Sequence, residues 1–370
     1  MIGAIIGDIV GSVYEFENIK TKEFPLFSEN SRFTDDTVCT MAVVDILLHH
    51  KDPVKTMVEW CRKYPAAGYG DKFMRWFNMP WQEPYNSFGN GAAMRVSPAG
   101  WLASSLEEAL LMSDRVTEIT HNHPEGIKGA RATVHAIFLA RQNVSSQQIR
   151  DEIELVYGYN LSQTVDDIRE NYEFDETCQG SVPQALICAL EATDYEDAIR
   201  NSISIGGDSD TIAAIAGAVA EARFRVPLPL EQAGCKFLPK DMLDELKLLY
   251  GQLFSGRPLC DVYYSTISRW IFLSMHSGSP ESDAVLKNLS NAMHSCDVSG
   301  TVWRNASLLV FNERFGFDKF HYDVSEYAQK SEIIDAMKPV WEYFELKWQE
   351  IPSEKRAEIE RCLREHHQGL

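Results

Sequence analysis

Two short runs of aspartate and threonine, far apart in the chain, hold the side chains best suited to chemistry. They are Thr34-Asp35-Asp36-Thr37 and Asp208-Ser209-Asp210-Thr211. Each run places two carboxylates and a threonine hydroxyl directly before a strongly apolar segment. The ordinary interpretation of one such run is a helix N-terminus. There, Thr and Asp side chains cap unpaired N–H groups and match the positive end of the helix dipole.

The likeness of the two runs favours a second interpretation, a shared cation site. If the helices that follow them lie side by side, four carboxylates meet, and like charges at close range cannot all stay ionised without a cation. Carboxylates and hydroxyls are hard oxygen ligands, which suit Mg²⁺, Mn²⁺ or Ca²⁺ rather than Zn²⁺. His121-Asn122-His123 has a possible zinc-ligand spacing, but no Cys or paired His motif follows it. The sequence therefore predicts a divalent-cation site between two helices.

The elements that position these residues are predicted to be helices. Apolar residues recur at helical spacing in several segments, and few segments alternate with period two, so we expect no sheet of consequence. The run at 214–220 is too small-sided and too apolar for a surface helix, which predicts a central helix with close neighbours. The predicted helical segments are 37–50, 105–117, 125–142, 145–157, 181–192 and 210–223.

A change of composition near residues 251–262 predicts a domain boundary. Glycine, serine and proline gather there, and the chain beyond has several tryptophans and an acid- and base-rich segment at 353–366 that we expect to be helical. We therefore expect a main domain over residues 1–254. Residues 255–370 should form a mostly helical accessory region, to which the sequence assigns no role.

The composition of the 370-residue chain is that of a globular protein, with 45% hydrophobic and 24% charged residues. Its formal net charge of −19 argues against a nucleic-acid partner, because phosphate backbones are bound by basic surfaces. The eight cysteines are scattered without close pairs, which favours reduced thiols and an intracellular protein. No apolar run reaches the ~20 residues that a membrane span needs. We expect a cytoplasmic protein with no membrane partner.

Five motifs occur in order along residues 1–225, and together they are specific although each alone is weak. They are Gly3-Ala4-Ile5-Ile6-Gly7-Asp8 with Gly11-Ser12-Val13-Tyr14-Glu15, Phe33-Thr34-Asp35-Asp36-Thr37, Gly89-Asn90-Gly91-Ala92-Ala93-Met94-Arg95, Thr120-His121 with Gly129-Ala130, and Gly206-Gly207-Asp208-Ser209-Asp210-Thr211. In this order they resemble the ADP-ribosylglycohydrolase family, of the dinitrogenase-reductase-activating-glycohydrolase type.

The resemblance implies an all-α fold, a compact orthogonal helical bundle with two Mg²⁺ or Mn²⁺ ions between central helices. Residues 1–254 would then be the catalytic domain. The implied substrate contains ADP-ribose, an ADP-ribosylated protein being the foremost example. By residue, the resemblance implies a metal-ligand set of Thr34, Asp35, Asp36, Asp208, Asp210 and Thr211.

The same resemblance implies catalytic and substrate-binding residues whose ordinary interpretations differ. Glu15 would act near the metals with Asp36 and Asp210, although by itself it is typical of a surface glutamate. The glycine-rich loop would contact diphosphate and ribose, although such loops are usually turns. His121 alone would more often be a hydrogen-bonded residue at a helix start. The implied substrate-binding residues are Ser87, Phe88, Gly89, Asn90, Gly91 and His121.

The hypothesis that follows is hydrolysis of the bond between C1″ of the distal ribose and an acceptor nitrogen or oxygen, with release of ADP-ribose. The acceptor is left open among arginine, serine, an acetyl ester, polymer and nucleic-acid ends. Two alternatives remain. One is a two-metal nucleotide phosphoesterase, and the other is a non-catalytic ADP-ribose-binding or structural Ca²⁺ protein.

Overall fold

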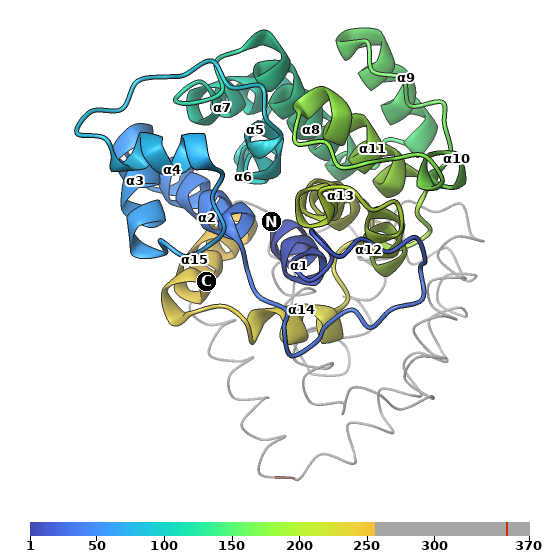
Figure 1. Ribbon diagram of the computed structural model, residues 1–370. Helices are drawn as coiled ribbons and strands as arrows, with labels where there is room; N and C mark the ends of the chain where they lie inside the picture. Colours follow the sequence, from blue (N-terminus) through green and yellow to red (C-terminus); the bar gives the residue numbers. More distant parts are fainter. Residues whose placement is uncertain (256–352, 354–370) are drawn as a thin grey trace, which may run out of the picture. The chain divides into compact units, whose positions relative to one another are not determined.

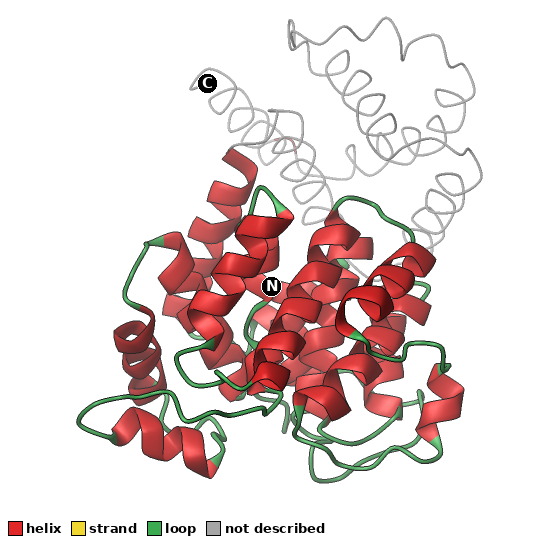
Figure 2. Ribbon diagram, turned by 90° about the horizontal axis from the view of Figure 1, so that it is seen from above, coloured by secondary structure: helices red, strands yellow, loops and turns green. Residues whose placement is uncertain are grey.

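The computed structural model describes residues 1–255 and residue 353, and the first 255 residues are built from helices (Figures 1 and 2). Over this range there is no strand, only an isolated antiparallel bridge between Gly89 and Thr177, so the all-α prediction is confirmed. The helices are α1 (Ile2–Gly11), α2 (Asp35–Leu48), α3 (Pro53–Lys63), α4 (Asp71–Asn78), α5 (Gly91–Met94), α6 (Ser97–Leu102), α7 (Leu106–Thr117), α8 (Pro124–Arg141), α9 (Ser146–Tyr157), α10 (Val165–Arg169), α11 (Cys178–Glu191), α12 (Tyr195–Ser204), α13 (Ser209–Phe224), α14 (Leu228–Cys235) and α15 (Lys240–Ser255).

Residues Met1–Leu253 form one compact unit. The predicted accessory region after residue 254 and its helix at 353–366 lie outside the described residues, apart from residues 255 and 353. The boundary at 254/255 and the role of the region beyond it therefore stay predictions. No helix in the described part is long and apolar enough to cross a membrane.

The centre of the described part is the pair α1 and α13, which lie side by side (Figure 1). Every residue of α1 is buried, and so is α13 from Ser209 to Glu221, which confirms the prediction of a central helix there. Gly3 and Gly7 of α1 allow the two backbones to approach closely. A Cβ atom on Gly7 would lie 2.1 Å from the carbonyl oxygen of Ala213, and one on Gly3 would lie 2.5 Å from that of Gly217.

Each helical segment predicted within residues 1–255 corresponds to an observed helix, and the start points differ where capping residues decide them. Helix α2 begins at Asp35 rather than at residue 37, because the Thr34 hydroxyl caps it by accepting a hydrogen bond from the Asp36 N–H (3.3 Å). Helix α11 begins at Cys178 rather than at residue 181, because Thr177 caps it in the same way and Pro183 is accommodated inside the helix. Helix α1 was not predicted, since a helix buried all round has no polar face to reveal its period.

Candidate active site

The N-termini of α2 and α13 bring the two aspartate runs together. The Thr211 hydroxyl of α13 donates a hydrogen bond to Asp36 Oδ2 of α2 over 3.1 Å. One carboxylate oxygen each of Glu15, Asp208 and Asp210 lie within 4.8 Å of one another. Both helix N-termini carry their carboxylates in the first turn or at the cap, where the helix dipole favours negative charge. Two runs separated by most of the domain therefore form one acidic cluster.

Asp8 of α1 holds the start of α2, and sequence reasoning assigned it no role. Its carboxylate accepts hydrogen bonds from the N–H groups of Thr34 (2.9 Å) and Thr37 (3.1 Å). It also accepts from both threonine hydroxyls, that of Thr34 over 2.7 Å. Because the Thr34 hydroxyl donates to Asp8, its lone pairs face away from α1. Asp8 therefore orients a residue of the predicted metal-ligand set.

The cluster contains several carboxyl groups, and burial raises their pKa values. Burial raises the pKa of Asp36 and that of Asp210 well above the usual range, and the neighbouring carboxylates add to both shifts. Burial is also the main reason that the pKa of Asp208 rises to about 6. The pKa of the half-buried Asp35 is also raised, mainly by burial and next by the charge of Asp210. Such a group of acids is costly to ionise without a counter-charge.

One atom of the cluster shows what kind of counter-charge would fit. Asp36 Oδ1 is buried and has no hydrogen-bond partner among the described residues. Buried polar atoms are nearly always paired, so an unpaired carboxylate oxygen indicates a missing ligand. The neighbouring donors are carboxylate and hydroxyl oxygens, the ligands that Mg²⁺, Mn²⁺ and Ca²⁺ prefer. The residues present therefore fit a hard divalent cation.

Glu15 reaches the cluster from the loop after α1, and an amide holds that loop in place. The Asn18 side chain donates to the carbonyl oxygens of Tyr14 (2.7 Å) and Gly207 (2.9 Å) and accepts from the Gly207 N–H (2.7 Å). Gly206 and Gly207 both have positive φ (69° and 76°), a conformation that glycine adopts easily. Sequence reasoning missed Asn18, because its partners lie at the far end of the domain.

The glycine-rich loop lies beside the segment that leads into α11. The Asn90 N–H donates to the Glu176 carbonyl oxygen (2.7 Å), and the Cys178 N–H donates to that of Phe88 (2.9 Å). The Asn90 side chain, which is buried, donates to Asp208 Oδ2 (2.6 Å) and to the Ser181 hydroxyl (3.0 Å). Asn90 therefore connects the loop to the acidic cluster and orients Asp208. The substrate contact that the sequence suggested for Asn90 stays a prediction.

His121 is buried and lies against this loop. A Cβ atom on Gly91 would lie 3.2 Å from His121 Nε2, so the loop passes close to the ring. Thr120 Oγ1 lies 2.7 Å from His121 Nδ1, and the buried Arg95 donates to the same hydroxyl (2.7 Å). Burial, and then the charge of Arg95, lowers the pKa of His121 well below its ordinary value. His121 is therefore a neutral ring that supports the loop.

The rest of the loop is partly open to solvent. Phe88 is 43% exposed, and its ring centre lies 5.2 Å from that of His123. The Ser87 hydroxyl accepts from the Gly89 N–H (3.2 Å). Among the predicted substrate-binding residues, Phe88 is thus the one with a free aromatic face, while the polar groups of Ser87 and Asn90 hold the loop together.

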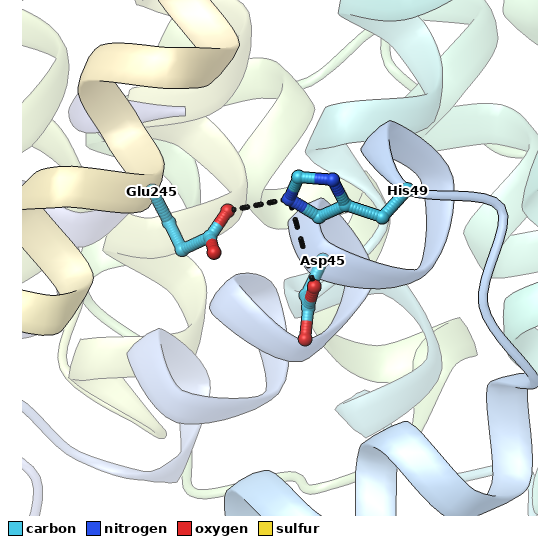
Figure 3. A group of neighbouring side chains, drawn as sticks. All are labelled: Asp45, His49 and Glu245. Carbon is cyan, nitrogen blue, oxygen red and sulfur yellow. Dashed lines mark hydrogen bonds and ion pairs between the residues drawn. The ribbon is translucent and has the colours of Figure 1, made fainter.

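A second group of possible ligands, Asp45, His49 and Glu245, lies at the opposite end of α2 (Figure 3). His49 Nε2 lies 3.1 Å from Glu245 Oε2 and 3.8 Å from Asp45 Oδ1. The Asp45 carboxylate also contacts Lys51 Nζ (2.8 Å) and accepts from the Trp60 indole N–H (3.0 Å). Lys51 balances the charge of Asp45, so this group fits a network of polar contacts that holds α15 to the end of α2.

Comparisons with known proteins show the family of the chain. A family model described as ADP-ribosylglycohydrolase matches residues 1–253. The chain belongs to the ADP-ribosylglycohydrolase family. The resemblance inferred from the motifs is thereby confirmed, and it extends through α14 and most of α15.

Three similar proteins are between 20% and 27% identical to the chain. It is 27% identical to "ADP-ribosylhydrolase ARH3" of Mus musculus, covering 66% of this chain and 88% of the relative. It is 21% identical to "ADP-ribosylarginine hydrolase Tri1" of Pseudomonas putida (strain GB-1), covering 61% and 70%. A solved "ADP-ribosylglycohydrolase-related protein complex" matches the fold with a TM-score of 0.51 at 20% identity, covering 68% of this chain and 97% of that one.

Proposed function

We propose that this protein is a Mg²⁺- or Mn²⁺-dependent hydrolase that cleaves the glycosidic bond between ADP-ribose and an acceptor, releasing ADP-ribose. The observation that carries the proposal is the acidic cluster at the N-termini of α2 and α13. There, Asp36 Oδ1 is buried without a partner and Glu15 lies beside Asp208 and Asp210. Family membership supports the reaction class, and the names of the two relatives associate them with ADP-ribose hydrolysis.

The cations would be held by the predicted ligand set. When bound, they supply positive charge that orients the ribose hydroxyls and lowers the pKa of a water molecule. Asn90 and Asp8 would orient ligands rather than bind a cation themselves, because each forms a hydrogen bond with one member of the set. Partners of this kind fix the direction in which a ligand atom points. The ligands are Thr34, Asp35, Asp36, Asp208, Asp210 and Thr211.

Glu15 is the proposed proton carrier. Burial, and then the charge of Asp210, raises its pKa to about 7, where a carboxyl group can both accept and return a proton. Its carboxylate would take a proton from the attacking water as the bond from that oxygen to C1″ forms. The bond from C1″ to the acceptor atom breaks, and the proton passes to the departing acceptor. Asp36 and Asp210 would hold the ribose in place for this exchange.

The glycine-rich loop would bind the remainder of ADP-ribose. Phe88 offers an exposed ring on which an adenine can stack. The loop N–H groups of Gly89 and Asn90 already donate within the protein, so diphosphate contacts depend on the loop's remaining polar groups and on the cations. His121 would stabilise the conformation of the loop through its close approach to Gly91.

Product analysis with a panel of acceptors tests the proposal. The full-length protein would be incubated with ADP-ribosylated arginine, ADP-ribosylated serine and O-acetyl-ADP-ribose, each with Mg²⁺, with Mn²⁺ and with a chelator. Release of free ADP-ribose that stops on chelation is the expected result. AMP or inorganic phosphate as the product would favour a phosphoesterase, and binding without turnover would favour a non-catalytic binding protein.

A further inference from the structure

A histidine and two carboxylates meet at the C-terminal end of α2, away from the acidic cluster (Figure 3). Asp45 lies in the last turn of α2, and His49 caps the same helix four residues later, so the two side chains share one face. Glu245 reaches them from α15. One possible ligand atom of each residue lies within 4.8 Å of the other two. The proposed reaction uses none of these three side chains.

The distances within this group are close to those between two ligands of one tetrahedral metal ion. His49 Nε2 lies 3.1 Å from Glu245 Oε2 and 3.8 Å from Asp45 Oδ1. Zinc binds imidazole nitrogen and carboxylate oxygen at about 2.0–2.2 Å, so neighbouring ligands of a tetrahedral ion lie roughly 3.3–3.6 Å apart. The two observed distances lie just outside the two ends of this range. Small side-chain rotations would therefore place all three atoms around one ion.

Asp45 is the member of the group that the protein orients most firmly. Its side chain is buried, and its Oδ2 accepts hydrogen bonds from the Trp60 indole N–H (3.0 Å) and the Lys51 ammonium (3.0 Å). Its Oδ1 lies toward His49 and accepts no hydrogen bond from the described residues. A partner that holds one carboxylate oxygen fixes the direction of the other. Because buried polar atoms are nearly always paired, Oδ1 indicates a further ligand.

The group has room for one more positive charge. Lys51 lies 2.8 Å from Asp45 Oδ1 and offsets one of the two carboxylate charges. The pKa of Lys51 is raised, first by its hydrogen bond to Asp45 and also by the charges of Glu245 and Glu59, so its surroundings are acidic. The Lys51 side chain is 47% exposed and can turn toward solvent when a metal ion takes its place at Oδ1. The second carboxylate charge remains for a cation that Glu245 and His49 share.

The types of ligand distinguish this group from the acidic cluster. Mg²⁺ and Ca²⁺ prefer sets of oxygen ligands, whereas an imidazole together with carboxylates suits Zn²⁺. His49 is exposed and Glu245 is half-buried, so an ion can enter from solvent and keep a water molecule as its fourth ligand.

We propose that Asp45, His49 and Glu245 form a zinc site that fastens α15 to the end of α2. The site is separate from the acidic cluster, because none of the three residues belongs to the predicted metal-ligand set. The inference therefore does not depend on the hydrolase function, and either proposal can fail while the other stands.

Calorimetric titration of the full-length protein with Zn²⁺, in saturating Mg²⁺ to occupy the acidic cluster, tests the proposal. His49→Ala and Glu245→Gln should weaken one equivalent of Zn²⁺ binding by at least the roughly 10–100-fold that loss of an outer-shell partner costs. His50→Asn is the matched control and should bind as the wild type does. It removes the neighbouring exposed histidine at a position with φ of 54°, which asparagine also adopts.

Hydrogen exchange provides a second measurement of the same site. Zn²⁺ should slow amide exchange in α15 of the wild type and of His50→Asn, because the ion joins α15 to a buried helix. It should leave exchange in His49→Ala and Glu245→Gln unchanged. The comparison is between each protein with and without Zn²⁺, so a weaker contact of α15 in the variants does not affect it.

Four results would overturn the zinc site. The first is equal Zn²⁺ binding by the wild type, His49→Ala and Glu245→Gln, and the second is an equal loss in His50→Asn. The third is a loss in Asp36→Asn but not in His49→Ala, which would place the ion at the acidic cluster. The fourth is stabilisation on acidification that needs His49 while Zn²⁺ has no effect, which would assign the added charge to a proton.

Discussion

At the scale of single residues, the candidate site depends on carboxylates that are oriented by neutral partners. Asp208 accepts from the Asn90 amide, Asp36 accepts from the Thr211 hydroxyl, and Thr34 donates to Asp8. These bonds are short and buried, so each fixes the direction of one oxygen atom. Changes at the carboxylates therefore test the charge of the cluster, and a change at Asn90 separately tests the direction of Asp208.

Asp36→Asn and Asp210→Asn should abolish turnover and leave the fold intact. Each change removes a negative charge that a cation would need, while the amide fills the same space. The loss of activity should exceed the roughly 10–100-fold that is typical of changes in an outer-shell partner. Release of ADP-ribose and far-ultraviolet circular dichroism check the two parts, with Asp151→Asn on the surface of α9 as the control. Wild-type rates in either variant would refute the assignment of the metal site.

Asn90→Ala separates a positioning role from a substrate contact. If Asn90 orients Asp208, the variant should need about 10–100-fold more Mg²⁺ for half-maximal activity and approach the wild-type rate when Mg²⁺ saturates. If the residue binds substrate, as the sequence suggested, KM should rise at every Mg²⁺ concentration and the Mg²⁺ requirement should not move. A titration of activity against Mg²⁺ at several substrate concentrations distinguishes these results.

At the scale of elements, the geometry of the site depends on how closely α1 and α13 approach. Glycines at positions 3, 7 and 11 recur every four residues, so they share one face of α1. A Cβ atom on Gly11 would lie 2.4 Å from Asp210 Cα. The last of these glycines therefore determines where the start of α13, and the carboxylates on it, can lie relative to α1.

Gly7→Ala should destabilise the protein by roughly 3 kcal/mol, the upper part of the range for overpacked cores. The added methyl group meets backbone atoms of Ala213 and Ala214, which cannot turn aside as a side chain can. A lower midpoint in thermal or denaturant unfolding is the measurement. Gly70→Ala is the matched control, because a Cβ atom there meets nothing within 4 Å. Equal midpoints for the two variants would contradict the close approach of α1 and α13.

At the scale of the whole molecule, a chain with a formal net charge of −19 carries a buried group of acids in the part that the structure describes. Without cations, burial raises the pKa of Asp8 and Asp208 to about 6 and that of Glu15 to about 7, from ordinary values near 4. The folded state then holds more protons than the unfolded chain between these values. The free energy of unfolding of the cation-free protein therefore falls as pH rises through this window.

A divalent cation should offset this fall in the free energy of unfolding at high pH. It binds the ionised carboxylates of the folded state, so the rise in Tm on adding saturating Mg²⁺ should be small near pH 5 and large near pH 8. Thermal unfolding with Mg²⁺ or with a chelator, at several pH values, provides the measurement. The difference should shrink in Asp36→Asn and Asp210→Asn. A Mg²⁺ effect that is equally large at both pH values in the wild type would show that the ion acts elsewhere.

The sequence by itself determined the class of fold and the position of several helices, although not that of α1. These follow from local signals: apolar residues at helical spacing, and threonines and aspartates that cap the helices they precede, as Thr34 caps α2. The resemblance of the ordered motifs to a family also needed no coordinates. Such features depend on neighbours within a few positions, which the sequence states directly.

The tertiary structure decided which residues complete the site. Asp8, Asn18 and Asn90 each form hydrogen bonds with groups that are distant in the chain. The stacking of Phe16 on Phe174 likewise joins two loops that are distant in the chain. Contacts of this kind depend on how the helices pack. The close approach of α1 and α13 brings distant loops together, and no local pattern encodes that distance.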